Sequence, residues 1–286
     1  FIFPMIFSIN TNELRENLLI IFYLIGPFNN VLGAVPEFIK IHVSINRINE
    51  LIRELHQRKK PVQEIEQGKE CTEVKSEIVI ELKDVCFEYE ETEETSFTLG
   101  PINWKIASED ITFITGENGS GKSTIAKLIT GLYSPTSGEI LLNGNKVRPE
   151  ELNKLFSAVF SDFHLFQKLY GIDYQNQKEM VQKYVDMLNM PNKVKINDKG
   201  EFENINLSTG QNKRLAFLIS CLENKPMMLF DEWAAEQDPK FRKYFYEELL
   251  PALHENKVGI IVISHDDRYF YIADNLLKLE TGRAQV

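Results

Sequence analysis

The sequence has few cysteines and no excess of positive charge. Its three cysteines, Cys71, Cys86 and Cys221, show neither metal-ligand spacing nor the spacing of a disulfide pair, which fits a reducing compartment. With 32 Lys and Arg against 42 Asp and Glu, the net charge is −10. Phosphate binding by a whole surface needs clustered cations, so we expect no nucleic-acid partner.

The chain also lacks an initiator Met and a basic, signal-type N-terminus. It begins Phe1-Ile2-Phe3, and its opening apolar run has no signal-type cleavage site, so we interpret the chain as a piece of a longer protein. Its 286 residues have room for one or two domains, and a hydrophobic content of 43% is enough to bury a sizeable core.

A long apolar stretch near the start predicts a membrane segment. Residues 18–35, LLIIFYLIGPFNNVLGAV, are about long enough to cross a hydrocarbon core as a helix. Asn29 and Asn30 would face other helices or a water-filled cavity rather than lipid, as pathway or packing residues. Residues 40–60 carry six Lys or Arg and two Glu, and this surplus places the chain after residue 40 in the cytoplasm.

A helical pattern follows the apolar stretch and predicts that the membrane helix continues into the cytoplasm. Its apolar positions recur at steps of four and three: Ile41, Ile45, Ile48, Ile52 and Leu55. The alternative is that residues 18–55 form one long buried helix of a soluble protein. Residues 57–76 lack an apolar period, which is typical of a linker. We therefore divide the chain into residues 1–56, the C-terminal part of a transmembrane domain, a linker over 57–76, and a second domain over 77–286.

The second domain alternates strands with helices, which is typical of an α/β fold, and it contains a phosphate-binding motif. The buried strand ITFIT leads into GENGSGKS at residues 116–123, which fits G-x-x-x-x-G-K-[ST]. Its glycines let backbone N–H groups point inward, the helix N-terminus adds partial positive charge, and Lys122 brings a cation to the β- and γ-phosphates. Ser123 is placed to ligate Mg²⁺. The predicted nucleotide-binding residues are Gly116, Asn118, Gly119, Ser120, Gly121, Lys122, Ser123 and Thr124.

A second helix N-terminus lies at Ser208, before a helix with one apolar face. Alone it would be only a helix cap. With the phosphate loop upstream and the strand MMLFDE downstream, the chain from about residue 77 to its end resembles ABC-type P-loop ATPases. The resemblance implies a mixed sheet core with a helical subdomain. It also implies that LSTGQ is the signature sequence of the family, which contacts the γ-phosphate of a nucleotide held by a second copy. The signature residues are Leu207, Ser208, Thr209 in place of a Gly, Gly210 and Gln211.

The same resemblance assigns roles to carboxylates and an aromatic residue. MMLFDE resembles Walker B, so Asp231 would hold Mg²⁺ through water and Glu232 would position the attacking water. Tyr89 would stack on adenine, or be a simple sheet aromatic. Asp238 matches the D-loop aspartate, although Asp-Pro is also an ordinary helix N-cap. Glu236 matches no role, and we expect it to be solvated.

Two further loops carry candidate residues. His265, in IIVISHDDRYF, resembles the switch histidine, although a lone His after a strand can be structural. The family usually has a Gln after the strand that follows the phosphate loop by about forty residues. Alignment of SAVFSDFHLF puts Ser161 at that position. Either Ser161 or Asp162 would contact the metal. The predicted catalytic residues are therefore Glu232, His265 and Lys122, with ATP and Mg²⁺ as cofactors.

Several segments together resemble bacterial ABC exporters of cyclic or lasso peptides and siderophore precursors: FSDFHLF, LSTGQNKRLA, FDEWAAEQDP, FYEELLPAL and SHDDRYF. The resemblance implies a homodimer in the lipid bilayer of the bacterial inner membrane, with its ATPase domains in the cytoplasm. Dimer closure would reach the membrane helices through residues 155–190. The alternatives are an exporter of lipid or drug-like cargo, a soluble ABC ATPase that acts as a mechanical switch, and a nucleotide-binding scaffold without turnover.

Overall fold

The computed structural model describes residues 77–89, 97–190, 193–203 and 207–285, together with helical residues scattered between positions 19 and 49. The chain divides into two units, Phe1–Thr72 and Glu73–Val286. These are described separately.

In the first unit, residues 22–30 and 44–49 are helical and exposed. Among the residues described, no helix combines the length and the apolarity that a membrane crossing requires. Part of the predicted membrane segment 18–35 lies outside the described residues, as do Ile52, Leu55 and the linker 57–76. The membrane segment and the domain boundaries therefore remain predictions.

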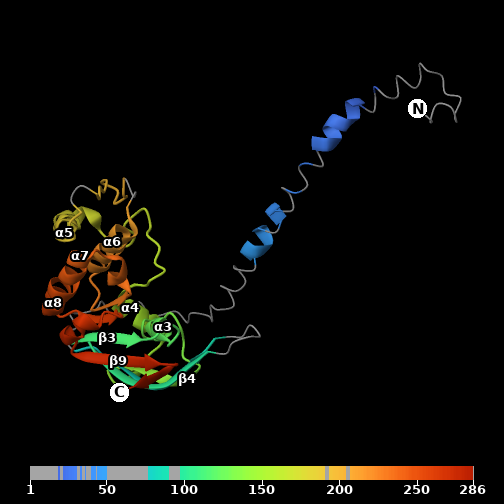
Figure 1. Ribbon diagram of the computed structural model, residues 1–286. Coiled ribbons are helices and arrows are strands. Elements are labelled where there is room, and N and C mark those ends of the chain that lie inside the picture. The colour runs from blue at the N-terminus through green and yellow to red at the C-terminus, as the bar shows by residue number, and fades with distance from the viewer. Residues whose placement is uncertain are drawn as a thin grey trace, which may run out of the picture. The chain divides into compact units, whose positions relative to one another are not determined.

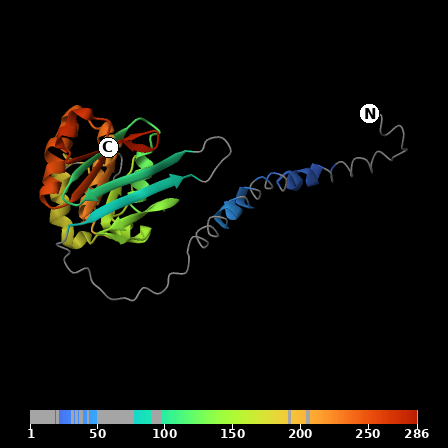
Figure 2. The ribbon, with the colours of Figure 1, turned by 90° about the horizontal axis from the view of Figure 1, so that it is seen from below.

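The second unit contains an antiparallel sheet built around one central strand. Residues 79–88 alternate between buried and more exposed side chains, as a strand with one face on the core does. Figure 2 shows the two longest strands of this sheet, β1 and β2, running side by side in teal. The strand order is β2 (Thr98–Ala107), β1 (Val79–Glu88), β4 (Ser137–Leu142) and β5 (Asn145–Lys146).

A second, mainly parallel sheet carries the predicted motifs. Its order is β10 (Arg283–Gln285), β9 (Asn275–Glu280), β3 (Ile111–Gly116), β8 (Gly259–Ile263), β7 (Met227–Asp231) and β6 (Phe156–Val159). All neighbours from β9 to β6 pair in parallel, and β10 pairs antiparallel with β9. The carboxyl ends of parallel strands meet at one edge, which brings the loops after β3, β6, β7 and β8 together.

Two apolar cores cover the two faces of this sheet. Strand β3 shows the division, because Phe113 belongs to one core and Ile114 to the other, and both are fully buried. The Ile114 core also contains the antiparallel sheet and helix α3 (Lys122–Ile129). α4 (Pro149–Leu155) adds Leu152 to it.

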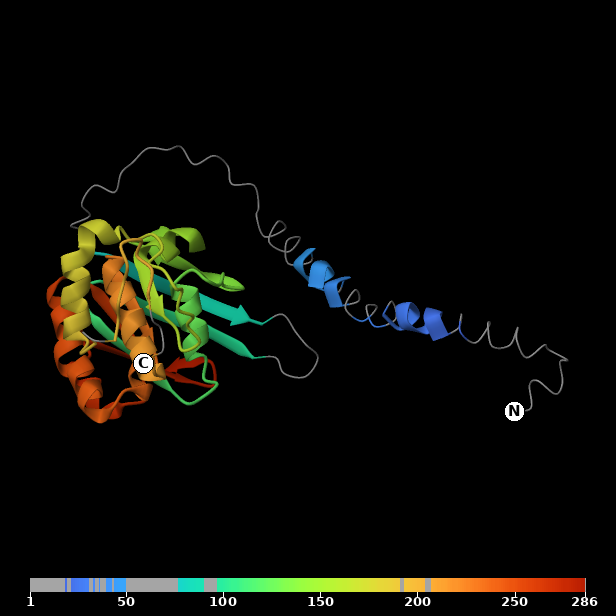
Figure 3. The same cartoon turned by 90° about the horizontal axis from the view of Figure 1, so that it is seen from above.

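The Phe113 core is covered by helices that gather at one end of the unit (Figures 1 and 3). α5 (Tyr174–Met187) packs beside α6 (Thr209–Leu222). A continuous helical stretch follows the 3₁₀ turn η1 (Trp233–Glu236): α7 (Pro239–Tyr244), the π turn η2 (Phe245–Leu249) and α8 (Leu250–Glu255). The 3₁₀ turn η3 (Asp267–Ile272) precedes β9.

The sequence reading missed parts of this fold. Leu132 continues the apolar helical spacing of Ile125, Leu128 and Ile129 in the sequence, but α3 ends at Ile129 and Leu132 is half exposed. The run PINWKI alternates in the sequence like a short strand, but it is only the middle of the ten-residue strand β2. Cys221 is buried, and this burial raises the pKa of its thiol to about 12, so it stays protonated.

Candidate active site

The loop between β3 and α3 wraps its backbone around Lys122. The ammonium Nζ donates to the carbonyl oxygens of Gly116 and Glu117, each at 2.9 Å. Lys122 is buried, and this burial lowers the pKa of its ammonium, against the raising effect of the Glu232 and Asp231 carboxylates. An anion in the loop would stabilise the charged form of Lys122.

Further hydrogen-bond donors in this loop lack acceptors. The hydroxyl of Ser120 is buried and has no hydrogen-bond partner in the described part of the chain. The N-cap of α3, Gly121, offers no side-chain acceptor, and the first N–H groups of any helix have no intrahelical partner. These donors and Lys122 converge at one helix N-terminus, which is the arrangement that binds phosphate groups. The loop therefore fits the phosphates of ATP.

Two hydroxyl groups meet one carboxylate beside the loop. Ser123 Oγ donates to Oδ2 of Asp231 at 3.1 Å, and Ser161 Oγ donates to the same oxygen at 3.5 Å. Asp231 is 2% exposed, and this burial is the main reason that its pKa is raised, while the hydrogen bond from Ser123 lowers it. A cation would relieve the cost of this buried charge.

The oxygen ligands fit Mg²⁺, which proteins bind through one or two carboxylates together with substrate phosphates. In the described ranges, no group of three His, Cys, Asp or Glu side chains could hold a metal by itself. Asp162 is exposed, and no hydrogen bond joins it to Asp231. The geometry of the described residues thus favours Ser161 over Asp162 as the neighbour of the metal position.

Glu232 and His265 face each other across the carboxyl edge of the sheet. Oε1 of Glu232 lies 3.4 Å from Nε2 of His265, and both side chains are about half exposed. Glu232 has a left-handed backbone (φ 50°), and its N–H donates to the carbonyl of Ile263 in the neighbouring strand at 3.0 Å. This turn directs its carboxylate into the same cleft as the phosphate loop.

That cleft has a volume of about 490 Å³ and opens between the phosphate loop and two aromatic side chains. It is lined by Tyr89, Phe97, Asn118, Gly119, Gly121, Lys122, Ser123, Thr124 and Glu232. The hydroxyl of Tyr89 lies 3.0 Å from Oγ1 of Thr124. Sequence reasoning missed Phe97, although an aromatic residue directly before a strand could have indicated it. Stacking of Tyr89 on adenine remains a prediction.

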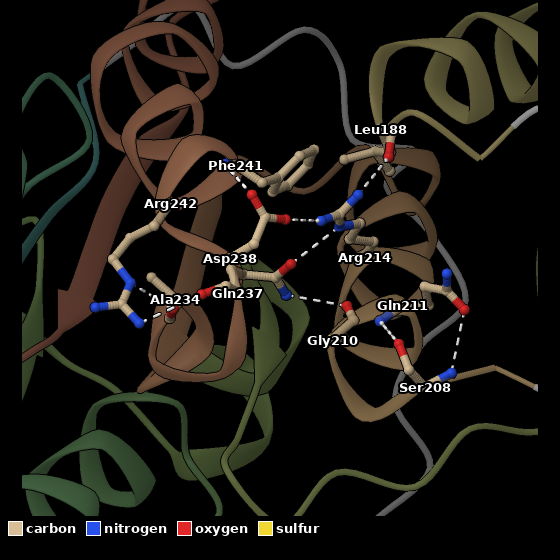
Figure 4. Close-up of polar contacts among 10 residues, drawn as sticks. All are labelled: Leu188, Ser208, Gly210, Gln211, Arg214, Ala234, Gln237, Asp238, Phe241 and Arg242. Carbon is tan, nitrogen blue, oxygen red and sulfur yellow. Dashed lines mark hydrogen bonds and ion pairs between the residues drawn. The ribbon is translucent and has the colours of Figure 1, made fainter.

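The signature segment begins α6 with a capping box. Ser208 Oγ accepts from the N–H of Gln211 at 3.3 Å, and the Gln211 side chain accepts from the N–H of Ser208 at 3.1 Å (Figure 4). Leu207 is partly buried and Thr209 is exposed. A Cβ atom at Gly210 would lie only 2.9 Å from the carbonyl oxygen of Glu236, so the loop after β7 packs directly on this helix end.

Asp238 caps α7 and also binds the signature helix. Its Oδ1 accepts from the N–H of Phe241 at 2.9 Å, and its Oδ2 accepts from Nη2 of Arg214 at 2.9 Å. These contacts, led by the Phe241 N–H, lower the pKa of Asp238. Arg214 Nε also donates to the side chain of Gln237 at 2.9 Å, and Gln237 donates to the carbonyl of Gly210 at 3.0 Å (Figure 4). The sequence reading missed Arg214.

Glu236 is exposed to solvent, as expected, and it also forms an ion pair with a buried side chain. Its carboxylate lies 3.6 Å from Nζ of Lys213, whose side chain is only 3% exposed. The same ammonium donates to the backbone carbonyl of Glu232 at 2.8 Å. Glu236 therefore compensates a buried lysine that holds the turn at Glu232.

Comparisons with known proteins identify the family. The ABC transporter family profile matches residues 99–235. The energy-coupling factor transporter ATP-binding protein EcfA1 of Staphylococcus epidermidis is 32% identical over 71% of the chain and 79% of its own length. The chain belongs to the ABC transporter family of ATP-binding proteins. The ATP-binding protein SyrD of Pseudomonas syringae pv. syringae is 38% identical over 98% of the chain, and the chain spans 51% of SyrD.

Solved structures share the fold. A bacterial Atm1-family ABC exporter with ATP bound has a TM-score of 0.60 and 22% identity, over 74% of this chain and 39% of that one. The dimeric ATP-binding cassette MJ0796, bound to ADP and Pi, has a TM-score of 0.61 and 23% identity, over 72% of this chain and 97% of that one. The predicted ABC fold, ATPase activity and cofactors are confirmed: the domain is an ABC ATPase that uses ATP and Mg²⁺.

The two glycines Gly116 and Gly119 provide a matched test of the phosphate loop. Both have positive φ, but a Cβ at Gly116 would lie 2.2 Å from the carbonyl oxygen of Leu279, whereas a Cβ at Gly119 would meet nothing within 4 Å. Gly116→Ala should separate β3 from β9, abolish ATP binding and lower the melting temperature. Gly119→Ala should cost only about 1–2 kcal/mol of backbone strain. Calorimetric ATP titration and thermal unfolding measure both, and equal effects would contradict this assignment.

A second pair of variants tests the metal position. Ser161→Ala removes the second hydroxyl beside Asp231, so we expect it to raise the Mg²⁺ concentration needed for half-maximal ATPase activity. Asp162→Ala should leave that concentration unchanged within about twofold, because a surface substitution without partners has little effect. Magnesium titrations of ATPase activity measure both. A larger shift in Asp162→Ala would move the metal contact from Ser161 to Asp162.

Proposed function

We propose that the chain is the C-terminal part of an ATP-driven exporter that works as a homodimer in the bacterial inner membrane. The observation that carries the ATPase half of this proposal is the contact of Glu232 with His265 beside the Ser123–Asp231 pair, in the cleft of the phosphate loop. The exporter half rests on the N-terminal segment. Residues 18–35 precede the ATPase domain in one chain, and the similarity to SyrD extends over 98% of the chain.

The relatives differ in how much of the chain they match. EcfA1 matches 71% of the chain, whereas SyrD also matches the part before the ATPase domain. The Atm1-family neighbour is described as an exporter, and MJ0796 as a dimeric cassette. This pattern supports membrane helices followed by a nucleotide-binding domain, and pairing of two copies.

The proposed chemistry uses the residues at the carboxyl edge of the sheet. Water would attack the γ-phosphorus of bound ATP, and the bond to ADP would break. Ser123 and Asp231 would hold Mg²⁺, which would neutralise the developing charge. Glu232 would accept hydrogen bonds from the water and orient it, while His265 holds the Glu232 carboxylate from the other side. Lys122 provides fixed positive charge in the loop. Ser208 and Gly210, at the N-terminus of α6, would complete the site of a second copy.

A groove beside residues 155–190 supports the proposed transmission of motion to the membrane domain. It has a volume of about 340 Å³ and lies between the loop after β6 and helix α6. Phe166 and Tyr170 on its rim are exposed, and their rings meet edge to face at 5.6 Å. Exposed aromatic residues at a groove are typical of a protein contact, and here the proposed occupant is the cytoplasmic end of the membrane helices.

We propose a peptide or siderophore precursor as cargo, on the resemblance of FSDFHLF, FDEWAAEQDP and SHDDRYF to exporters of that subgroup. Lipid or drug-like cargo is the alternative. The cargo itself would be bound by membrane helices.

Glu232→Gln tests the assignment of the base. The amide keeps the size of the side chain but cannot accept a proton, so ATPase kcat should fall at least about 100-fold while ATP still binds. Glu255→Gln is the control, because Glu255 is an exposed carboxylate at the end of α8 and lies outside the lining of the cleft. Its kcat should stay within about threefold. Steady-state ATPase kinetics and ATP titration measure both, and full turnover in Glu232→Gln would remove Glu232 as the base.

The exporter proposal is tested on the full-length protein in lipid vesicles. We expect candidate peptides or siderophore precursors to raise ATPase activity and to accumulate on the far side of the bilayer only with ATP. Glu232→Gln should abolish both effects. Extraction of the protein from membranes by carbonate would contradict the exporter, and stimulation by lipid or drug-like compounds alone would contradict the cargo.

A further inference from the structure

Arg242, on α7, binds the loop that begins at Glu232. Its Nε donates to the carbonyl of Ala234 at 3.1 Å, and its Nη2 donates to the carbonyl of Gln237 at 3.3 Å (Figure 4). The same Nη2 donates to the carbonyl of Ala235 at 2.8 Å. These carbonyls belong to the 3₁₀ turn η1 and the residue after it. Arg242 lies four positions after the N-cap Asp238, so the first turn of α7 contacts the loop that leads into it.

The same guanidinium also faces the loop after β8, which carries His265. Nη1 of Arg242 lies 3.6 Å from Oδ1 of Asp266, the residue after His265, and the two side chains are 22% and 20% exposed. The N–H of Asp266 donates to Oγ of Ser264 at 3.0 Å. The hydroxyl of Tyr246, in the π turn after α7, lies 2.7 Å from that same Oγ and is buried. The α7–η2 helix therefore holds the loop of His265 through two side chains.

We infer that Arg242 is a positioning residue that sets the distance between Glu232 and His265. The two side chains meet at 3.4 Å, yet each stands on a separate loop, and Arg242 bonds to both loops. This inference rests on the proposed roles of Glu232 and His265. Arg242 does not line the nucleotide cleft, so it acts through the two loops and not on the substrate.

The guanidinium group suits this task. It is planar and carries five N–H donors in a fixed arrangement, and here Nε, Nη1 and Nη2 all have partners. A lysine could pair with Asp266 or cap one or two carbonyls, but its single ammonium could not hold both loops in the same geometry. Catalysis is sensitive to such placement, because an error of about 1 Å can cost about 100-fold in rate.

The test uses the full-length protein in lipid, with ATPase kinetics and thermal unfolding. Arg242→Ala and Arg242→Lys should lower kcat about 10- to 100-fold. The KM for ATP should stay within about twofold, because the cleft is unchanged. Arg268→Ala is the matched control: Arg268 also lies 3.5 Å from Oδ1 of Asp266, but it is 68% exposed and makes no contact with residues 234–237. Its kcat should stay within about twofold.

A double-variant cycle separates positioning from general stability. Asp266→Asn should lower kcat, and adding Arg242→Lys to it should cost less than the two separate losses combined, because both act on one contact. Unchanged kcat in Arg242→Lys, or a loss of kcat matched by equal rises in KM and falls in melting temperature, overturns the inference. If Glu232→Gln is inactive while Arg242→Lys is normal, only this inference fails. If Glu232→Gln turns over normally, the proposed function fails first.

Discussion

The site depends on the parallel pairing of β3 with β8 and β9 and of β7 with β6 and β8. Because these strands run in one direction, the loops that follow them leave the sheet at one edge. Lys122, Ser161, Asp231 and His265 lie at or just beyond the carboxyl ends of four different strands, and the sheet brings them together. The apolar cores on both faces fix the strands, so the polar residues at the edge need not stabilise the fold themselves.

The electrostatics of the site oppose folding without ligands and favour binding. Lys122 and Asp231 are both buried. Burial lowers the pKa of Lys122 and raises the pKa of Asp231, and both shifts favour the neutral form of the side chain. Their partners in the described chain are backbone carbonyls and hydroxyl groups, which offset only part of this cost. Phosphate oxygens would complement Lys122, and Mg²⁺ would complement Asp231. Lys122 and Asp231 are thus arranged for a ligand that combines anionic phosphates with a metal cation.

The sequence predicted the parts of the site that lie within short segments. The phosphate loop, the Asp231–Glu232 pair and the helix cap at Ser208 each depend on residues within a few positions of one another, so their spacing was informative. The antiparallel sheet was only partly predicted, because its pairing joins distant residues, such as Ile80 with Leu142. Arg214 and Arg242 were missed for the same reason: their partners lie on other elements, and a charged residue on a helix normally indicates a solvated face.

The contact between the signature helix and the loop after β7 has a consequence for a pair of copies. Gly210 packs on the carbonyl of Glu236, and Arg214 and Gln237 join the same two elements. In a symmetric dimer, the N-terminus of α6 in one copy would face the nucleotide bound by the other copy. The loop after β7, which packs on that helix end, would border the nucleotide bound by its own copy. The two nucleotides would then be thermodynamically linked, and linkage is reciprocal, so each would alter the affinity of the other by the same factor.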